Sequence, residues 1–137
     1  VGFDLAVNGG QSGTGEFNPV NGDLNINSAN VFTNGNTLHV YGTNNKTVTF
    51  GATTVISQTG HFNVEQASNV VFLGNNTYTG TTTVTGGTLQ ITNANSLGST
   101  AAGTTVQSGA TLALAGTGTT FAAEALKRHE HACIRST

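Results

Sequence analysis

The sequence predicts an all-β chain wound into a parallel β-helix, or solenoid, of about five coils. Three observations predict this fold. Thr, Asn and Gly make up 60 of the 137 residues, and these residues favour extended strands and tight turns over helices. Apolar residues alternate with polar ones in strand-length pieces. Equivalent apolar positions also recur with a period of about 24 residues, which is typical of a repeat architecture.

The composition favours one folded domain and excludes several classes of partner. Only 7% of the residues are charged and the formal net charge is -2, so the chain has no basic stripe that would bind nucleic acid. No apolar run approaches the roughly 18 residues that indicate a transmembrane segment, and no signal segment is visible at Val1. Such a polar bias is also typical of disordered chains, but disorder does not produce regular apolar alternation.

Six pairs of apolar residues stand at i and i+2, which places both side chains of a pair on one face of a strand. They are Leu24/Ile26, Leu38/Val40, Val48/Phe50, Phe62/Val64, Leu89/Ile91 and Leu112/Leu114. The clearest coil contains strands at 47–50, 53–57 and 61–64, separated by Gly51 and Gly60. Gly allows the tight bends that such short strands require, so each coil is expected to hold two or three strands.

The period stacks equivalent side chains on one another in successive coils. One full period joins Leu24 to Val48, Ile26 to Phe50, Val31 to Val55, Leu38 to Phe62, Val40 to Val64 and Val48 to Phe72. Farther along, the spacing lengthens between Phe62 and Leu89 and shortens again between Leu89 and Leu112. We therefore expect an inward ladder of Leu38, Phe62, Leu89 and Leu112.

The alternative fold is an antiparallel β-sandwich. Three dipeptides typical of β-hairpin turns favour it, namely Asn8-Gly9, Asn21-Gly22 and Asn34-Gly35. The structure of a sandwich does not require apolar residues to recur every 24 positions, so the solenoid is the preferred prediction.

One stretch carries the clearest motif. Leu73-Gly74-Asn75-Asn76-Thr77-Tyr78-Thr79-Gly80 is followed by Thr82-Thr83-Val84 and Gly87-Thr88-Leu89, and a weaker copy of the second half occurs at 105–114. Over about residues 70–115 this order resembles the passenger-associated transport repeat, the autotransporter-associated β-strand repeat of bacterial type V secretion passengers. The motif positions are Gly74, Asn76, Thr77, Tyr78, Gly80, Thr83, Val84, Gly87, Leu89 and Leu112.

The resemblance implies a right-handed parallel β-helix that is secreted through the outer membrane and exposed at the cell surface or released. In that family the repeat aids passenger export and folding and carries no catalytic residues. The expected function is therefore a structural segment of a passenger, a stalk or adhesin scaffold, and not an enzyme. Since these residues include no signal segment and no translocator, we expect a piece of such a protein or a relative that has lost its secretion parts. The alternative function is a module that binds glycans or ice through outward Thr and Asn.

No set of residues predicts a catalytic, cofactor or metal site. Glycoside hydrolysis needs two neighbouring carboxylates, and no acidic pair stands at i, i+2 or at one period among Asp4, Glu16, Asp23, Glu65, Glu124 and Glu130. His39 and His61 should point outward on one sheet, either as a shared metal or glycan site or as two unrelated histidines.

Thr-x-Thr patterns resemble the flat threonine arrays of ice-binding β-helices. They occur at Thr47/Thr49, Thr77/Thr79 and Thr81/Thr83/Thr85. One period after the first pair come the apolar residues Val71 and Leu73, which break the array.

The end of the sequence differs from the rest, and we divide the chain into β-helix repeats at 1–118 and a C-terminal segment at 119–137. Residues 127–137 hold three of the four Lys and Arg residues, two of the four His residues and the only Cys. Three interpretations stay open: a vector-derived or out-of-frame tail, a capping helix over Phe121 to Ala132, or a metal site of His129, His131 and Cys133.

A β-helix with open ends exposes unpaired strand edges, which invite further pairing. We therefore expect copies of this chain to stack end to end into fibres. The expected partners are the chain itself or host and surface glycans, without nucleic acid.

Overall fold

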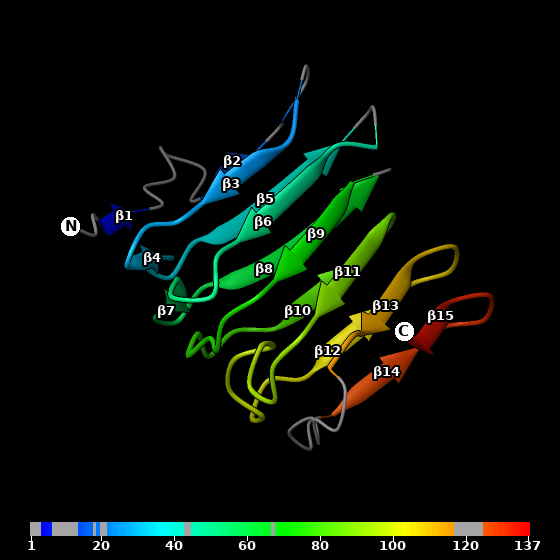
Figure 1. Cartoon of the computed structure of the whole chain (residues 1–137). Helices are drawn as coiled ribbons and strands as arrows, with labels where there is room; N and C mark the ends of the chain where they lie inside the picture. The colour runs from blue at the N-terminus through cyan, green and yellow to red at the C-terminus, as the bar shows by residue number, and fades with distance from the viewer. Residues whose placement is uncertain are drawn as a thin grey trace.

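The computed structural model describes residues 4–6, 14–17, 19, 22–42, 45–66, 68–116 and 125–137. These residues form fifteen strands in three parallel sheets and contain no helix (Figure 1). No helix among them is therefore long and apolar enough to cross a membrane.

The three sheets run along the three sides of a coil. The short sheet contains β1 (Asp4–Ala6), β4 (Asn30–Phe32) and β7 (Val55–Ser57). The first long sheet contains β2 (Thr14–Phe17), β5 (Thr37–Gly42), β8 (His61–Gln66), β10 (Thr82–Val84), β12 (Thr104–Val106) and β14 (Leu126–Arg128). The second long sheet contains β3 (Leu24–Ile26), β6 (Thr47–Phe50), β9 (Asn69–Phe72), β11 (Thr88–Ile91), β13 (Thr111–Leu114) and β15 (Cys133–Ser136).

The chain visits the sheets in a fixed order, and the described strand pairs are all parallel. This topology is a β-solenoid of about five turns, so the predicted fold class is confirmed and the antiparallel sandwich is not formed. Beyond β7 the third side continues without regular strands. There the backbone N–H groups of Thr77 and Tyr78 donate to the Ile56 carbonyl at 2.8 and 3.1 Å, and the Ser99 N–H donates to the Tyr78 carbonyl at 2.9 Å.

The register confirms part of the predicted stacking. Leu24 pairs with Val48, Ile26 with Phe50, Leu38 with Phe62, Val40 with Val64, and Leu89 with Leu112. Two predicted pairs are shifted along the strand, because Val31 pairs with Ile56 and not Val55, and Val48 pairs with Val70 and not Phe72.

The predicted ladder of Leu38, Phe62, Leu89 and Leu112 is wrong, because it joins residues of two sheets. Phe62 of β8 pairs with Thr82 of β10, which comes earlier in the chain than the expected partner. Leu89 of β11 belongs to the second long sheet and pairs with Val70. The coil is shorter at this point, and a polar residue occupies the inward position at which an apolar anchor was expected.

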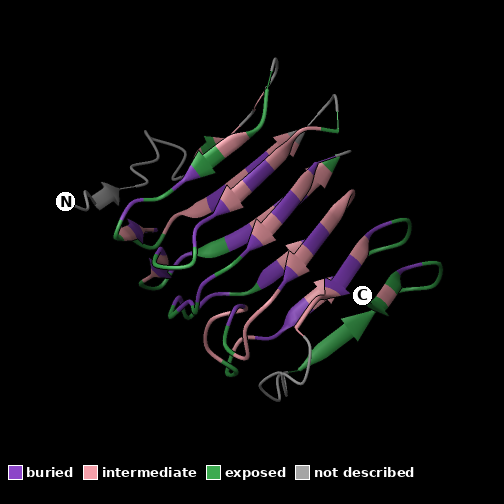
Figure 2. Ribbon diagram, viewed as in Figure 1, coloured by how far each residue is buried: buried purple, intermediate pink, exposed green. Residues whose placement is uncertain are grey.

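Side chains that point inward fill the space between the sheets. Figure 2 marks the buried residues along the ribbon. Along most strands buried residues alternate with more exposed ones, as in β6 and β11, so most inward residues are apolar and most outward ones are polar. At the centre the rings of Phe50, Phe62 and Phe72 meet edge to face, with centroids 4.8 to 5.7 Å apart. Such T-shaped pairs add about 0.5–1.5 kcal/mol each beyond the area they bury.

The last residues form one more turn of the solenoid. β14 pairs with β12 and β15 pairs with β13, so the predicted capping helix over Phe121 to Ala132 is wrong for its described part, which begins at Ala125. The Thr104 N–H donates to the Ala125 carbonyl and the Cys133 N–H donates to the Ala110 carbonyl, both at 2.9 Å. Pairing as strands therefore satisfies backbone groups of the preceding coil, which a helix at this place would leave unpaired. The boundary predicted between residues 118 and 119 lies outside the described residues.

Candidate functional site

The motif residues from Gly74 to Leu89 form one coil of the solenoid, and Leu112 lies on β13 in the next coil. The stretch from Leu73 to Gly80 crosses the third side between β9 and β10, and residues 73–82 alternate strictly between exposed and buried. Gly74, Asn76, Tyr78 and Gly80 point inward. Leu73, Asn75, Thr77 and Thr79 are exposed. The alternation shows that this segment is extended although it has no ladder of its own.

Three motif glycines stand where neighbouring backbone leaves no room for a side chain. A Cβ atom would lie 2.7 Å from the Thr54 carbonyl oxygen at Gly74, and 2.3 Å from the Gly60 carbonyl oxygen at Gly80. At Gly87 it would lie 2.0 Å from the Ser68 carbonyl oxygen, and the φ angle there is +65°. The order of glycines in the motif thus matches the points at which adjacent coils approach most closely.

Asn76 joins three coils through one buried side chain, which is 4% exposed. Its Oδ1 accepts the Ile56 N–H at 2.9 Å, and its Nδ2 donates to the Ser96 carbonyl at 2.6 Å. Its own N–H donates to the Asn95 carbonyl at 3.0 Å. The residue therefore replaces the ladder hydrogen bonds that are missing where the short sheet ends.

Tyr78 is fully buried and its hydroxyl contacts the buried Thr82 hydroxyl at 2.5 Å. This contact explains how a threonine can occupy the inward column of Leu38 and Phe62. One coil later Thr104 takes the same position, and its buried hydroxyl has no hydrogen-bond partner among the described residues. The weaker second copy of the motif thus keeps the threonine but has no equivalent of this contact.

The remaining motif positions contribute to the stacked columns. Thr83 lies half-buried on the outer face between Asn63 and Thr105. Val84, Leu89 and Leu112 are buried and pair with Val64, Val70 and each other along the columns.

Replacing Tyr78 with phenylalanine should lower the free energy of unfolding by about 1–3 kcal/mol, because the Thr82 hydroxyl stays buried without this partner. Adding Thr82→Val removes that hydroxyl, so the double variant should recover most of the loss. Urea unfolding of the two single variants and the double variant measures the coupling. Purely additive losses would show that the hydroxyl contact does not exist.

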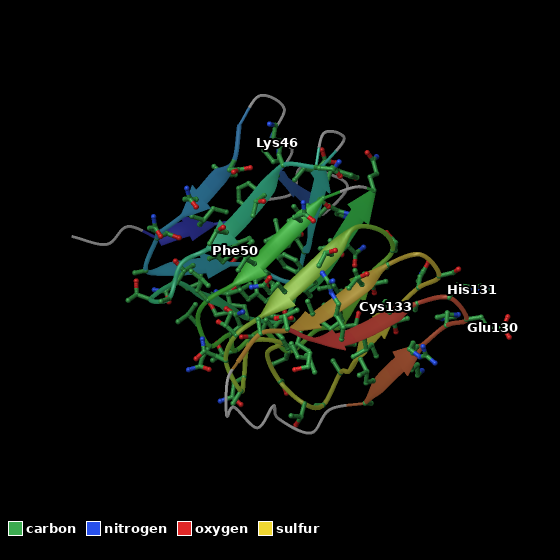
Figure 3. All side chains as sticks on the ribbon, turned by 45° about the vertical axis from the view of Figure 1, so that its right-hand side comes forward. Lys46, Phe50, Glu130, His131 and Cys133 are labelled. Atoms are coloured by element: carbon green, nitrogen blue, oxygen red, sulfur yellow. The ribbon has the colours of Figure 1, made fainter. Side chains whose placement is uncertain are left out.

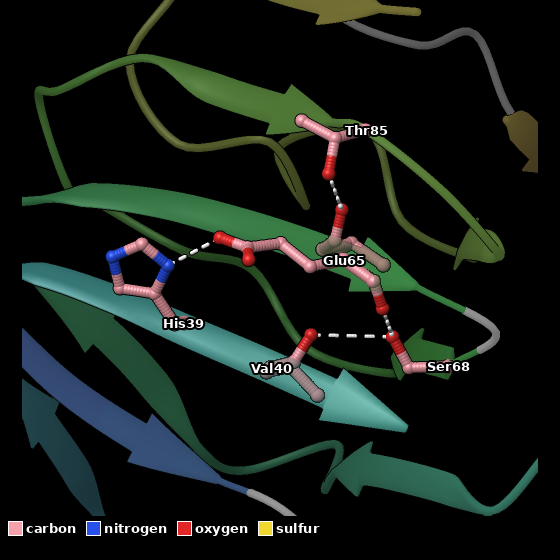
Figure 4. A network of polar contacts seen from close by, with 6 residues as sticks. His39, Val40, Glu65, Ser68 and Thr85 are labelled. Carbon is pink, nitrogen blue, oxygen red and sulfur yellow. Dashed lines mark hydrogen bonds and ion pairs between the residues drawn. The ribbon is translucent and has the colours of Figure 1, made fainter. Parts of the chain in front are cut away.

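A second group of polar side chains lies on the outer face of the first long sheet. The His39 Nδ1 is paired with the Glu65 carboxylate, and the rings of His39 and Tyr41 stack with centroids 5.8 Å apart. Figure 4 shows His39 and Glu65 facing each other across adjacent strands, while Ser68 Oγ donates to the Val40 carbonyl at 3.2 Å behind them. Glu16 is aligned with His39 on the next strand.

The electrostatics of this group centre on Tyr41. Loss of solvent around its hydroxyl raises the pKa of Tyr41 above its ordinary value of 10.0, and the negative charge of Glu65, then that of Glu16, and a hydrogen bond to Glu16 raise it further. The phenol is therefore neutral at physiological pH and donates to the Glu16 carboxylate. No sequence motif predicted this group, although the spacings from Glu16 to His39 and from Tyr41 to Glu65 follow the coil period.

The other candidates from the sequence are dispersed. His61 lies on the outer face of the same sheet as His39, but its Nδ1 accepts the Thr81 N–H at 2.9 Å. Asp23 Oδ1 accepts the Thr47 N–H at 2.8 Å. Asp4 is described by its backbone alone, and Glu124 lies outside the described residues.

The charged C-terminal turn carries no assembled metal site in the part of the chain that the structure describes. His131 and Glu130 lie at the turn between β14 and β15, and Cys133 begins β15 (Figure 3). No group of three or more His, Cys, Asp or Glu side chains among the described residues could hold a metal ion.

The outward threonines form only a partial array. Thr47 has Asn69 beside it, followed by Thr88 and Thr111, whereas Thr49 is followed by Val71. Threonine therefore recurs along the first column, whereas the column of Thr49 continues through Val71, Gln90 and Ala113 without another threonine among these described residues.

Comparison with known proteins identifies the motif coil. Residues 67–91 match the family model described as the passenger-associated-transport-repeat, which confirms the predicted resemblance for the coil from β9 to β11. No curated protein and no solved structure matches the chain.

Proposed function

We propose that this chain is a structural segment of a secreted, surface-exposed bacterial autotransporter passenger, where it acts as a stalk or adhesin scaffold and aids export and folding. The observation that carries the proposal is the coil at 67–91, which matches a passenger repeat. A repeat of that kind suggests a secreted protein with a non-enzymatic role.

The construction of the coil supports a role in folding. Each coil contacts its neighbours in the stack, so a solenoid can fold by adding coils to one that is already formed. The motif coil is stabilised by the Asn76 bonds to two neighbouring coils and by the Tyr78–Thr82 contact. We propose that it serves as the coil on which the rest of the passenger assembles after it leaves the membrane.

An export assay tests this function. The chain is placed between a signal sequence and an autotransporter translocator in a Gram-negative bacterium, and external protease measures how much reaches the cell surface. The unaltered chain should be displayed, and Gly87→Ala should lower display severalfold because a passenger destabilised by about 1–2 kcal/mol or more is lost to proteolysis. The matched control Gly22→Ala, where a Cβ atom meets nothing within 4 Å, should be displayed nearly as well.

Two results would contradict the proposal. One is retention of the unaltered chain in the periplasm. The other is equal display after residues 67–91 are replaced by a flexible linker of the same length, because the repeat would then make no contribution to export.

We also propose that copies of this chain stack end to end. The outermost described strands of the long sheets, β2 and β3 at one end and β14 and β15 at the other, have a neighbour on one side only. Such edges present rows of backbone donors and acceptors that can pair with another chain.

A further inference from the structure

The outermost described strands of the two long sheets have matching geometry. Both long sheets are parallel throughout, from β2 to β14 and from β3 to β15. A second copy placed beyond β14 and β15 would therefore continue each sheet with its own β2 and β3 in the same strand direction. A head-to-tail contact of this kind uses different surfaces on the two copies and grows into an open filament.

The register along the first long sheet decides which residues would meet. One outward column runs through Glu16, His39, Asn63, Thr83, Thr105 and Lys127. Its two end residues, Glu16 and Lys127, are both exposed and carry opposite charges. We call the contact between β14 and β15 of one copy and β2 and β3 of the next the joint. Continuing the column across the joint places the backbone of Lys127 of one copy about 4.8 Å, one strand spacing, from the backbone of Glu16 of the next.

The inward columns also end in residues that a second copy would cover. Leu126 is 43% exposed, and Ile134 at the same end is half-buried. Leu24 at the other end is also half-buried, and it begins the column that Ile134 ends. In the joint, Ile134 of one copy would stack on Leu24 of the next.

The two edges also carry opposite charges. Glu16 and Asp23 are exposed at the β2 and β3 end, whereas Lys127, Arg128 and Arg135 are exposed at the β14 and β15 end, together with one acid at the turn, Glu130. Arg128 ends the inward column that begins at Phe17, and its guanidinium Nη1 donates to the Ala132 carbonyl at 3.0 Å at the same end.

From these observations we infer that a second copy of this chain binds head to tail through a joint in which Lys127 pairs with Glu16 and Ile134 stacks on Leu24. The joint rests on the end-to-end stacking proposed above and names the surfaces that form it. Complementary charge sets the register and direction of such an interface more than its total affinity.

A charge-swap experiment tests the joint. The full chain, Lys127→Glu and Glu16→Lys are compared at low salt with a reductant present, so that the exposed Cys133 cannot form cross-links. Sedimentation and electron microscopy then measure the concentration at which fibres appear. Each single variant places like charges in every joint and should raise that concentration roughly tenfold or more.

The mixture of the two variants gives the decisive result. Each joint between Lys127→Glu and Glu16→Lys copies again brings opposite charges together, so the equimolar mixture should form fibres at the concentration of the unaltered chain. The matched control is Lys46→Glu, because Lys46 is the only other lysine and directly precedes β6, which lies one strand inside the edge strand β3 and has a neighbour on both sides. It should leave assembly unchanged.

The experiment distinguishes failure of this joint from failure of end-to-end stacking. Fibres that form equally well from both single variants, or a mixture no better than either variant alone, would overturn this joint while leaving stacking in place. An unaltered chain that stays monomeric at every concentration would overturn both the joint and the stacking, and circular dichroism of each variant would show that its fold is intact.

Discussion

Replacing Asn76 with alanine is expected to lower the free energy of unfolding by about 2–5 kcal/mol, through lost hydrogen bonds and a new cavity. The substitution leaves the Ile56 N–H and the Ser96 carbonyl without the partners they have now, and each unsatisfied buried group costs about 1–3 kcal/mol. The loss of a buried side chain adds a cavity term. Urea unfolding followed by circular dichroism measures the change.

The neighbouring asparagine provides the control for this prediction. Asn75 is exposed, so Asn75→Ala should change the free energy of unfolding by less than about 0.5 kcal/mol. Similar losses in both variants would mean that Asn76 does not bridge the coils as the structure places it.

The second large effect is expected for Gly87→Ala, at about 2–5 kcal/mol, from backbone strain and a steric clash together. The φ angle of +65° disfavours any residue with a Cβ atom, and that atom would lie 2.0 Å from the Ser68 carbonyl oxygen. The same carbonyl accepts the Thr88 N–H at 2.9 Å, so moving the two coils apart strains this bond as well. Chemical unfolding of the variant gives the size of the loss.

Gly109 separates the two causes of that loss. Its φ angle is +80°, yet a Cβ atom there meets nothing within 4 Å, so Gly109→Ala measures the backbone cost alone, about 1–2 kcal/mol. Gly22→Ala, with open space around it as well, should be close to neutral. Equal losses at Gly87 and Gly109 would contradict the close approach of the coils at Ser68.

Much of the fold could be predicted because a solenoid repeats one physical pattern. The pair Leu38 and Val40 alternates with polar neighbours and recurs at Phe62 and Val64, and these residues do stack in register. The sequence signal is strong here because both coils have equal length and apolar inward residues. The glycine and asparagine positions of the motif likewise mark places where only those residues fit.

The prediction failed where an inward residue is polar. Thr82 takes the position after Phe62 because Tyr78 satisfies its hydroxyl, and a search for apolar anchors passes over it to Leu89. The final turn was missed for a related reason. The charged residues Lys127 and Arg128 do not resemble a core strand, yet they lie in β14. Ile134 does continue the inward column that contains Leu112.

The outer-face group of Glu16, His39, Tyr41 and Glu65 could have been found from the sequence only with the correct strand register. Glu65 contacts His39 across adjacent strands, although the residue aligned with His39 is Asn63, two positions before Glu65. No search for acidic pairs detects a contact between an acid and a histidine, and the ring stacking depends on side-chain rotamers that sequence does not specify.

Disulfide trapping tests the central claim, a parallel solenoid whose coil is shortened at the motif so that β8 pairs with β10. In a Cys133→Ser background, cysteines replace Asn63 and Thr83, which are outward neighbours on these two strands. Parallel neighbours lie at a separation that a disulfide can span, so mass spectrometry after mild oxidation should show a nearly complete intramolecular bond. The comparison pair is Asn63→Cys with Gln90→Cys, which the longer step from Phe62 to Leu89 would place together; a bond in this second pair and none in the first would contradict the account.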